Sequence, residues 1–320
     1  MVAALPATSD SYRIMNFHTG LSRDGPGVLV RDLLANPENP DLASVAALRP
    51  DIAVFQNVDY DFDRVALGLI QKSLSLMGHP MPHAYTTRPN TGVDSGYDLD
   101  RNGKRGEPRD MLGYGRFTGQ GGMALLSRFP VEAGTARNLT DMLWRDASQQ
   151  GPPANGYFTP GELAVLPLHS VSAWDVTVHT PNGPLRILTS HASTPAFDGP
   201  EDRNGLRNAA ELQFWESYIA QVEDEQVPFV LMGTLNNDPM AGEGHKQAIE
   251  NLLNHPSLQD PRPTHAGEPE TALWANGLSL RVDYVLPSHG LGVRAAAVEW
   301  APQSPEGSRH YPIWVDVVWQ

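Results

Sequence analysis

One short run of the sequence has the residue types and the spacing of a cation-binding loop. Asp98-Leu99-Asp100-Arg101-Asn102-Gly103 matches the first six positions of a calcium loop, Asp-x-Asp-x-Asn-Gly. Alternate side-chain oxygens in such a run converge on one centre, and the glycine permits the sharp turn. The Lys104 carbonyl would be the ligand at the seventh position, and Asp110 or Glu107 would close the shell. The pattern predicts a site for Ca²⁺ or another structural cation.

The run departs from a full helix–loop–helix calcium site at its far end. Position twelve is Arg109 rather than the bidentate Glu, and no helix is evident on either side. A solvated loop closed only by Asx turns explains the same residues without an ion. We expect the ion, because a cation would keep the long Gly- and Pro-rich stretch from about residue 88 to 122 in order. The expected ligands are Asp98, Asp100, Asn102, Lys104 and Asp110. Since calcium is abundant outside cells, the motif also favours an exported protein, periplasmic or extracellular.

The composition limits the other chemistries. With no cysteine in 320 residues, the sequence excludes disulfides, thiolate zinc sites and cysteine nucleophiles. A net charge of −14 argues against nonspecific binding of nucleic acid, which requires clustered Lys and Arg. No stretch approaches the roughly 18 apolar residues that cross a bilayer. Residues 1–11 lack the basic start and apolar core of an intact secretion signal. We expect a disordered stub there, which is either the remnant of a removed signal or the frayed terminus of a cytoplasmic protein.

The elements that must position these side chains are short apolar strands interspersed with helices. Apolar runs bounded by turn residues predict strands at 13–17, 51–55, 122–127, 174–178, 185–191, 228–233, 280–286 and 311–317. Apolar residues that recur every three or four positions predict helices at 62–77, 206–222 and 248–253, the first closed by Gly78. The mixture indicates an α+β fold, with sheets flanked by helices, in a single domain over residues 12–320.

Seven segments, taken in chain order, carry a resemblance to a known superfamily. They are Ile14-Met15-Asn16-Phe17-His18, 50–57, 122–130, Thr189-Ser190-His191, 233–239, 281–285 and Ser308-Arg309-His310-Tyr311-Pro312. Together they resemble the endonuclease/exonuclease/phosphatase superfamily over nearly the whole chain. Segments 88–92, 115–123 and 197–208 resemble a bacterial, often secreted branch of it. The resemblance implies a four-layer α/β/β/α sandwich of two mixed β-sheets. It also implies the activity typical of the superfamily, cleavage of phosphoester bonds with Mg²⁺ or a related cation at the strand ends.

The sequence departs from the superfamily pattern where the metal should bind. The family's N-terminal Asn aligns best with His18, and less well with Asn16. The metal-binding Glu falls on Asn57, the Asp of Gly-Asp-x-Asn on Thr234, and the Asp of Ser-Asp-His on Arg309. The family residues that are kept are His191, Asn236, Asp283 and His310. Because Mg²⁺ requires anionic oxygens and Arg309 would repel a cation, we expect the Mg²⁺ mechanism to be absent or badly weakened.

The remaining polar residues are better suited to an anion than to a metal. The resemblance implies catalytic roles for His191, His310, Asp283 and Asn236, and substrate-binding roles for His18, Asn57, Thr234 and Arg309. Five alternatives stay open. The three histidines could hold a metal with Asp59 or Asp238, and Thr234 could be a nucleophile.

The other three alternatives are structural. Asp283 could be a surface charge paired with Arg281, and Asn57 and Arg309 could be remnants of a dead site. His191 and His310 could simply be hydrogen-bonded at strand ends.

Two functions follow from this site. The first is a hydrolase that acts on a phosphate ester or another small anionic ester in a cleft without the usual Mg²⁺ carboxylates. The second is a noncatalytic relative that binds an anionic ligand or a protein partner in the same cleft. The net charge of −14 and the missing carboxylates disfavour a third, a secreted nuclease.

Overall fold

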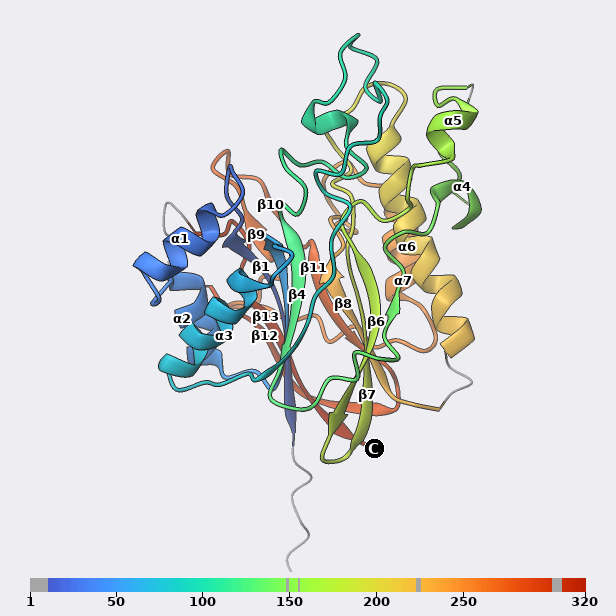
Figure 1. The fold of residues 1–320 in the computed structure, drawn as a ribbon. Coiled ribbons are helices and arrows are strands. Elements are labelled where there is room, and N and C mark those ends of the chain that lie inside the picture. The colour runs from blue at the N-terminus through green and yellow to red at the C-terminus, as the bar shows by residue number, and fades with distance from the viewer. Residues whose placement is uncertain (1–10, 148–149, 155, 223–225, 301–306) are drawn as a thin grey trace, which may run out of the picture.

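The computed structural model describes residues 11–147, 150–154, 156–222, 226–300 and 307–320. Two β-sheets lie face to face in the middle of the molecule, with helices on both outer faces (Figure 1). The predicted N-terminal stub lies, apart from Ser11, outside the described residues. No described helix combines the length and the apolar character that crossing a lipid bilayer requires.

The first sheet has six strands in the order β12-β13-β1-β2-β4-β3. Its strands are β1 (Tyr12–Leu21), β2 (Ile52–Val58), β3 (His83–Tyr85), β4 (Gly122–Ser127), β12 (Leu291–Val298) and β13 (Ile313–Trp319). β1 and β2 are parallel, and the other neighbours are antiparallel. β13, near the end of the sequence, therefore pairs directly with β1, near its start, so that segments far apart in the sequence meet inside one sheet.

The second sheet has five strands in the order β11-β8-β7-β6-β5. Its strands are β5 (Arg137–Asn138), β6 (Ala173–Thr180), β7 (Gly183–His191), β8 (Phe229–Thr234) and β11 (Asp283–Pro287). β7 and β8 are parallel, so both end at the same side of the sheet, whereas β11 begins there because it runs antiparallel to β8. A separate two-stranded ribbon pairs β9 (Ala272–Leu273) with β10 (Ser279–Leu280).

The helices form the two outer layers. The helices beside the first sheet are α1 (Val28–Ala35), α2 (Pro40–Leu48) and α3 (Val65–Leu76) (Figure 1). Those beside the second sheet are α4 (Trp144–Ala147), α5 (Pro160–Leu163), α6 (Arg203–Val222) and α7 (Lys246–Leu253) (Figure 1). A single 3₁₀ turn, η1 (Pro108–Asp110), lies in the long segment between β3 and β4.

Strand alternation distributes the apolar side chains among three cores. On β1, Ile14 packs between the two sheets, whereas its neighbour Met15 packs against the helices of the first layer. On β7, Ile187 faces the space between the sheets and Leu188 faces α6. Successive strand residues point to opposite faces, so a strand buried on both sides needs an unbroken apolar run. The three cores between four layers confirm the α+β four-layer sandwich that the resemblance implied.

The predicted elements agree with the structure except where exposure hides the pattern. The helix predicted at 62–77 is α3, and Gly78 closes it with φ 78°, a left-handed conformation that glycine adopts without strain. The strand predicted at 280–286 is wrong in its start, because the chain breaks after β10 and β11 begins at Asp283. β12 was not predicted, since several of its residues are exposed and alanine-rich. α1 and α2 were missed for the same reason, because only a few of their side chains are buried.

The long segment between β3 and β4 is ordered by its own backbone. It stands above the strand ends at the top of Figure 1. Gly92 has φ 69°, and a Cβ there would lie 1.9 Å from the Phe117 carbonyl oxygen, so only glycine allows the two parts of the segment to meet. The amide of Gly92 also donates to the carbonyl of Gly113 at 2.9 Å. The segment thus folds back on itself next to the cavity described below.

Candidate functional site

Ladder register brings three of the predicted residues into one row across the second sheet. His191 at the end of β7 pairs with Thr234 at the end of β8, and Thr234 pairs with Asp283 at the start of β11. Residues paired in register project from the same side of a sheet. The row therefore places an imidazole, a hydroxyl and a carboxylate side by side, although they are separated by up to 92 positions in the sequence.

The first sheet supplies two more of the predicted residues through a β-bulge. The register between β1 and β2 shifts after His18, and the pairing of β2 with β4 shifts between Gln56 and Val58. Asn57 lies in this bulge with φ 60°, a left-handed conformation that Asn tolerates better than most residues. Its Nδ2 donates to the Thr19 carbonyl at 2.8 Å. A Cβ on Gly121 would lie 2.8 Å from the Asn57 Oδ1, so the glycine makes room for this side chain.

Asp283 is the centre of a buried hydrogen-bond network. Its carboxylate accepts from His310 Nδ1 at 2.7 Å, from the Thr234 hydroxyl at 2.6 Å and from the Thr271 hydroxyl at 2.8 Å. Asn16 Nδ2 lies 3.5 Å from the same carboxylate, and Asn16 in turn accepts from Gln56. Asp283 is 1% exposed, so it is not the surface charge paired with Arg281 that the strand pattern also allowed. Arg281 binds Asp260 instead.

Three histidines meet beside this network. The rings of His18 and His310 are stacked, with centroids 4.0 Å apart, and His191 makes an edge contact with His18 at 5.2 Å. Burial, with a smaller contribution from the neighbouring His310, lowers the pKa of His191 to about 4. Burial, together with the two other histidines, also holds the pKa of His18 well below its usual range. His18 and His191 are therefore neutral at pH 7, and the Nδ1 atoms of both are buried without a hydrogen-bond partner.

The other two predicted residues lie apart from these histidines. Asn236 has φ 55°, and its Nδ2 donates to the Ala192 carbonyl at 2.8 Å, which fixes the chain just after His191. Arg309 is exposed at the surface beside His310. Neither side chain lines the cavity, so their proposed roles in holding a substrate remain predictions. Thr234 donates its hydroxyl proton to the Asp283 carboxylate at 2.6 Å and does not line the cavity, so a role as nucleophile also remains a prediction.

A cavity of about 680 Å³ opens over the histidines. His18, Asn57 and His191 form its polar floor, whereas His310, Asp283 and Thr234 lie behind that floor and do not line it. The walls come from the segment between β3 and β4, from the chain after β7 and from the start of α6. The charged residues that line it are Arg109, Arg116, Arg203, Arg207 and a single acid, Asp24. A cavity of this size suits a small molecule, and its charge suits an anion.

Buried polar residues hold the cavity wall in place. Glu211 on α6 is fully buried, and its carboxylate accepts from the backbone amides of Ser170 and Ser193 at 2.8 and 2.6 Å. Both serines line the cavity. Burial raises the pKa of Glu211 to about 7. This carboxyl therefore fastens two loops of the wall to α6.

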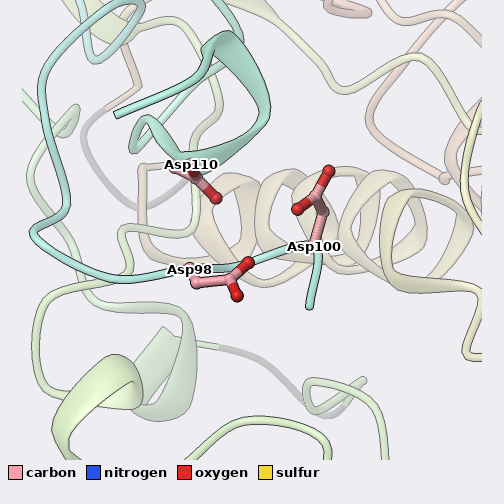
Figure 2. Close-up of side chains that lie close together, drawn as sticks. All are labelled: Asp98, Asp100 and Asp110. Carbon is pink, nitrogen blue, oxygen red and sulfur yellow. The ribbon is translucent and has the colours of Figure 1, made fainter. Parts of the chain in front are cut away.

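The predicted calcium loop places its acidic side chains together. Figure 2 shows Asp98, Asp100 and Asp110 pointing toward one centre, and their ligand oxygens all lie within 4.8 Å of one another. Asn102 lies beside them, with its Nδ2 3.2 Å from Asp100 Oδ2. The amide of Lys104 donates to Asn102 Oδ1 at 2.8 Å. The oxygen set is of the kind that calcium prefers, so the residues fit the ion.

The spacing of ligand atoms also bears on the alternative of a metal site formed by the three histidines. Among the described residues, this acidic triad is the one group of three or more His, Asp or Glu ligands that gathers closely enough to hold a metal. The three histidines, with or without Asp59 or Asp238, do not gather in this way. A face-to-face stack of two imidazoles also directs their nitrogens alongside each other rather than toward a shared ion. The geometry therefore does not favour a histidine metal centre.

Comparison with known proteins settles the family. The model of the Endonuclease/Exonuclease/phosphatase family matches residues 21–310. The chain belongs to this family. No curated protein matches the sequence. Members of this family are commonly phosphoesterases or nucleases.

Solved structures of the family share the fold at low sequence identity. An endonuclease/exonuclease/phosphatase from Beutenbergia cavernae is 21% identical, with a TM-score of 0.60 over 97% of this chain and 72% of that chain. The human Nocturnin catalytic domain with a bound sulfate anion is 17% identical, with a TM-score of 0.56 over 97% of this chain and 94% of that chain. The 3′ phosphatase NExo from Neisseria, bound to a product DNA hairpin, is 20% identical, with a TM-score of 0.53 over 96% of this chain and all of that chain.

The residues at the family's metal positions do not fit Mg²⁺. His18, Asn57, Thr234 and Arg309 offer no carboxylate between them. Asp283 is the one acid in the network, and its two oxygens are already shared among His310, Thr234 and Thr271. Mg²⁺ is bound through carboxylates and waters in octahedral geometry. The neutral and cationic side chains here supply neither the charge nor the free oxygens for it.

Sequence reasoning missed two residues in this site. Thr271 was not identified, because it lies outside any recognisable motif and reaches Asp283 only through the pairing of β9 with β10. Arg109 was not assigned to the site either, because it was interpreted only as position twelve of the calcium-like loop, whereas the segment that holds Arg203 and Arg207 was expected at the mouth of the cleft. A usable signal was present for Asn16, a polar residue inside an apolar strand, which is fully buried in the network.

Proposed function

We propose that this chain binds a small anionic ester, such as a phosphate ester, in the cavity and hydrolyses it without the family's metal carboxylates. The observation that carries the proposal is the His310–Asp283 pair, which two threonine hydroxyls hold in place directly behind the histidine floor of the cavity. A buried carboxylate that accepts the Nδ1 proton leaves the Nε2 of His310 as a base. Within the described residues, no partner binds that Nε2.

The reaction requires only this chain's residues and water. His310 Nε2 takes a proton from water as the water oxygen attacks the phosphorus of the ester. The bond from phosphorus to the alcohol oxygen breaks, and the imidazolium returns its proton to that oxygen. Asp283 stabilises the imidazolium, and Asn57 on the floor orients the anion. The products are the free acid anion and the alcohol, so His310 ends as it began.

A second function, binding without turnover, has its own support. His310 does not line the cavity, and the ring of His18 is stacked on its face at 4.0 Å. If His18 keeps substrate away from the Nε2 edge of His310, the cavity binds its anion and releases it unchanged. Both functions predict an anionic ligand, and turnover separates them.

The deciding experiment is hydrolysis of p-nitrophenyl phosphate and bis(p-nitrophenyl) phosphate in the presence and absence of a chelator. We expect turnover that survives the chelator and that falls by about 100-fold or more in His310→Ala, the usual size of a general-base effect. His289→Ala, at an exposed position outside the site, is the matched control and should keep full activity. If the wild type hydrolyses neither ester, the protein is a binder, and turnover that the chelator abolishes would refute the metal-independent reaction.

We also propose that the loop at 98–110 binds Ca²⁺ as a structural ion, outside the cavity. The converging carboxylates of Asp98, Asp100 and Asp110 support this. The loop motif adds the Asn102 side-chain oxygen and the Lys104 carbonyl as further ligands. A calcium site of this kind supports export to a calcium-rich compartment, periplasmic or extracellular. The ion would stabilise the wall of the cavity and take no part in the reaction.

A further inference from the structure

We infer that the cavity contains a second anion subsite, formed by Arg109 and Arg203, and that its natural ligand therefore carries two anionic groups. The inference rests on the proposed function, because it assigns a substrate class to the same cavity. One anionic group would lie over the histidine floor, and the other would be bound by the arginines of the wall. Bisphosphates, and phosphate esters that also carry a carboxylate, belong to this class.

The cavity concentrates positive charge in an otherwise acidic protein. Four arginines line it against one aspartate, although the whole chain has 23 Lys and Arg against 37 Asp and Glu. Arg116 forms an ion pair with that aspartate, Asp24. Within the part of the chain that the structure describes, the three other arginines have no ion pair with a carboxylate. An acidic chain that leaves three guanidiniums unneutralised in one cavity has a site for an anion from outside.

Arg109 is held rigidly by its backbone, yet its side chain contacts no partner. It is the middle residue of η1, where Glu107 and Asp110 cap each other's backbone amides. Asp110 is fully buried and also accepts from the Leu99 amide at 2.8 Å. Arg109 lines the cavity, and among the described residues its side chain makes no hydrogen bond or ion pair. A fixed turn thus presents an unused bidentate donor to the cavity.

Arg203 and Arg207 add charge from the start of α6. Arg203 is the first residue of α6, and its one hydrogen bond goes to the Leu99 carbonyl at 2.9 Å. Arg207 follows one turn later and donates only to carbonyl oxygens, those of Leu112, Pro167 and Leu168. Burial lowers the pKa of Arg207 to about 10, so it remains a cation at pH 7. The Leu99 carbonyl accepts from Arg203, and the Leu99 amide donates to Asp110. Leu99 therefore connects the start of α6 to the turn that carries Arg109.

The histidine floor and the arginine wall of the cavity differ in chemistry, so each suits a different anionic group of one ligand. The floor offers neutral imidazoles and an amide, which suit a group that must react. The wall offers guanidiniums, which bind planar or tetrahedral anions through paired N–H donors. A ligand with one anionic group satisfies only one of these ends, and it leaves the other cations unpaired.

The test is calorimetric binding of compounds that cannot be hydrolysed. Methylphosphonate carries one anionic group, and the alkylene bisphosphonates with one, three and five carbons carry two at increasing spacing. We expect at least one bisphosphonate to bind tenfold or more tightly than methylphosphonate, and Arg109→Ala to reduce that gain to threefold or less. Because Arg109 has no contact to lose, the variant should keep the wild-type fold, which its melting temperature checks.

Arg105→Ala is the matched control, since Arg105 is exposed on the same segment and does not line the cavity. It should keep the full gain. If no bisphosphonate binds more tightly than methylphosphonate, or if the gain survives Arg109→Ala, the subsite is refuted. These probes are never turned over, so the result is independent of hydrolysis. A preserved gain in a protein without esterase activity would retain the subsite and reject only the hydrolytic function.

Discussion

Burial and two histidine neighbours lower the pKa of His18, and His310 also contributes to the lowered pKa of His191. The ring of His18 is stacked on His310 and makes an edge contact with His191. Burial already lowers the pKa of His191 from 6.5 to about 4. In the unfolded chain the same side chain takes up its proton near pH 6.5. The unfolded state therefore binds more protons between these values, and the free energy of unfolding falls as the pH falls through this window.

We predict that His191→Asn removes about 3 kcal/mol of this acid sensitivity, the energy of a pKa lowered from 6.5 to about 4. Urea unfolding gives the free energy of unfolding of the variant and of the wild type at pH 7 and at pH 4. The difference between the two proteins should change by this amount between the two pH values. The comparison cancels Glu211, whose raised pKa acts in the opposite sense because that carboxyl takes up its proton near pH 7 in the folded state. His289→Asn, at an exposed position, should show no such change. An equal pH dependence in His191→Asn and wild type would contradict the buried neutral imidazole.

Among the elements, the loop at 98–110 connects a candidate ion to the cavity wall. The turn that brings Asp110 into the acidic triad also carries Arg109 to the cavity. This loop was predictable because its ligands are local, a few positions apart in the sequence. The arginine was not, because nothing in a local motif says toward which side the next side chain points. Spacing identified the acidic residues that gather in this loop, and only the three-dimensional structure showed what their turn supports.

We predict that a chelator lowers the melting temperature of the wild type by roughly 5 °C, since an ion that binds only the folded state adds about 3 kcal/mol at 100 times its dissociation constant. Asp100→Asn in calcium should melt like the chelated wild type and respond no further to the chelator. Thermal unfolding followed by circular dichroism measures both. Asp63→Asn, at an exposed aspartate without contacts, should keep the full response. A melting temperature that neither change moves would mean a loop closed by its own turns.

Across the whole molecule, chain order carried more information than any local pattern. Seven weak segments in the right sequence predicted the sandwich, and the ladder register then placed His191, Thr234 and Asp283 in one row. Alignment of motifs gives a position but no side-chain direction, which is why it could not show that Arg309 is exposed and does not line the cavity. Thr271 lies on a short ribbon with no motif of its own. The site was predictable as far as the family motifs reach, and the cavity wall lies beyond them.

The net charge of the molecule decides the last prediction, which concerns nucleic acid. The Neisseria relative was solved with a DNA hairpin, so the family comparison does not exclude DNA for this chain. Nonspecific binding, however, requires several phosphate contacts, and this chain has a net charge of −14, with four of its arginines lining one cavity. We predict no change in the fluorescence anisotropy of a labelled duplex with about 10 μM protein, at either about 50 or about 200 mM salt. Binding that weakens as salt rises would instead show phosphate contacts outside the cavity and would restore a nuclease as the family activity of this chain.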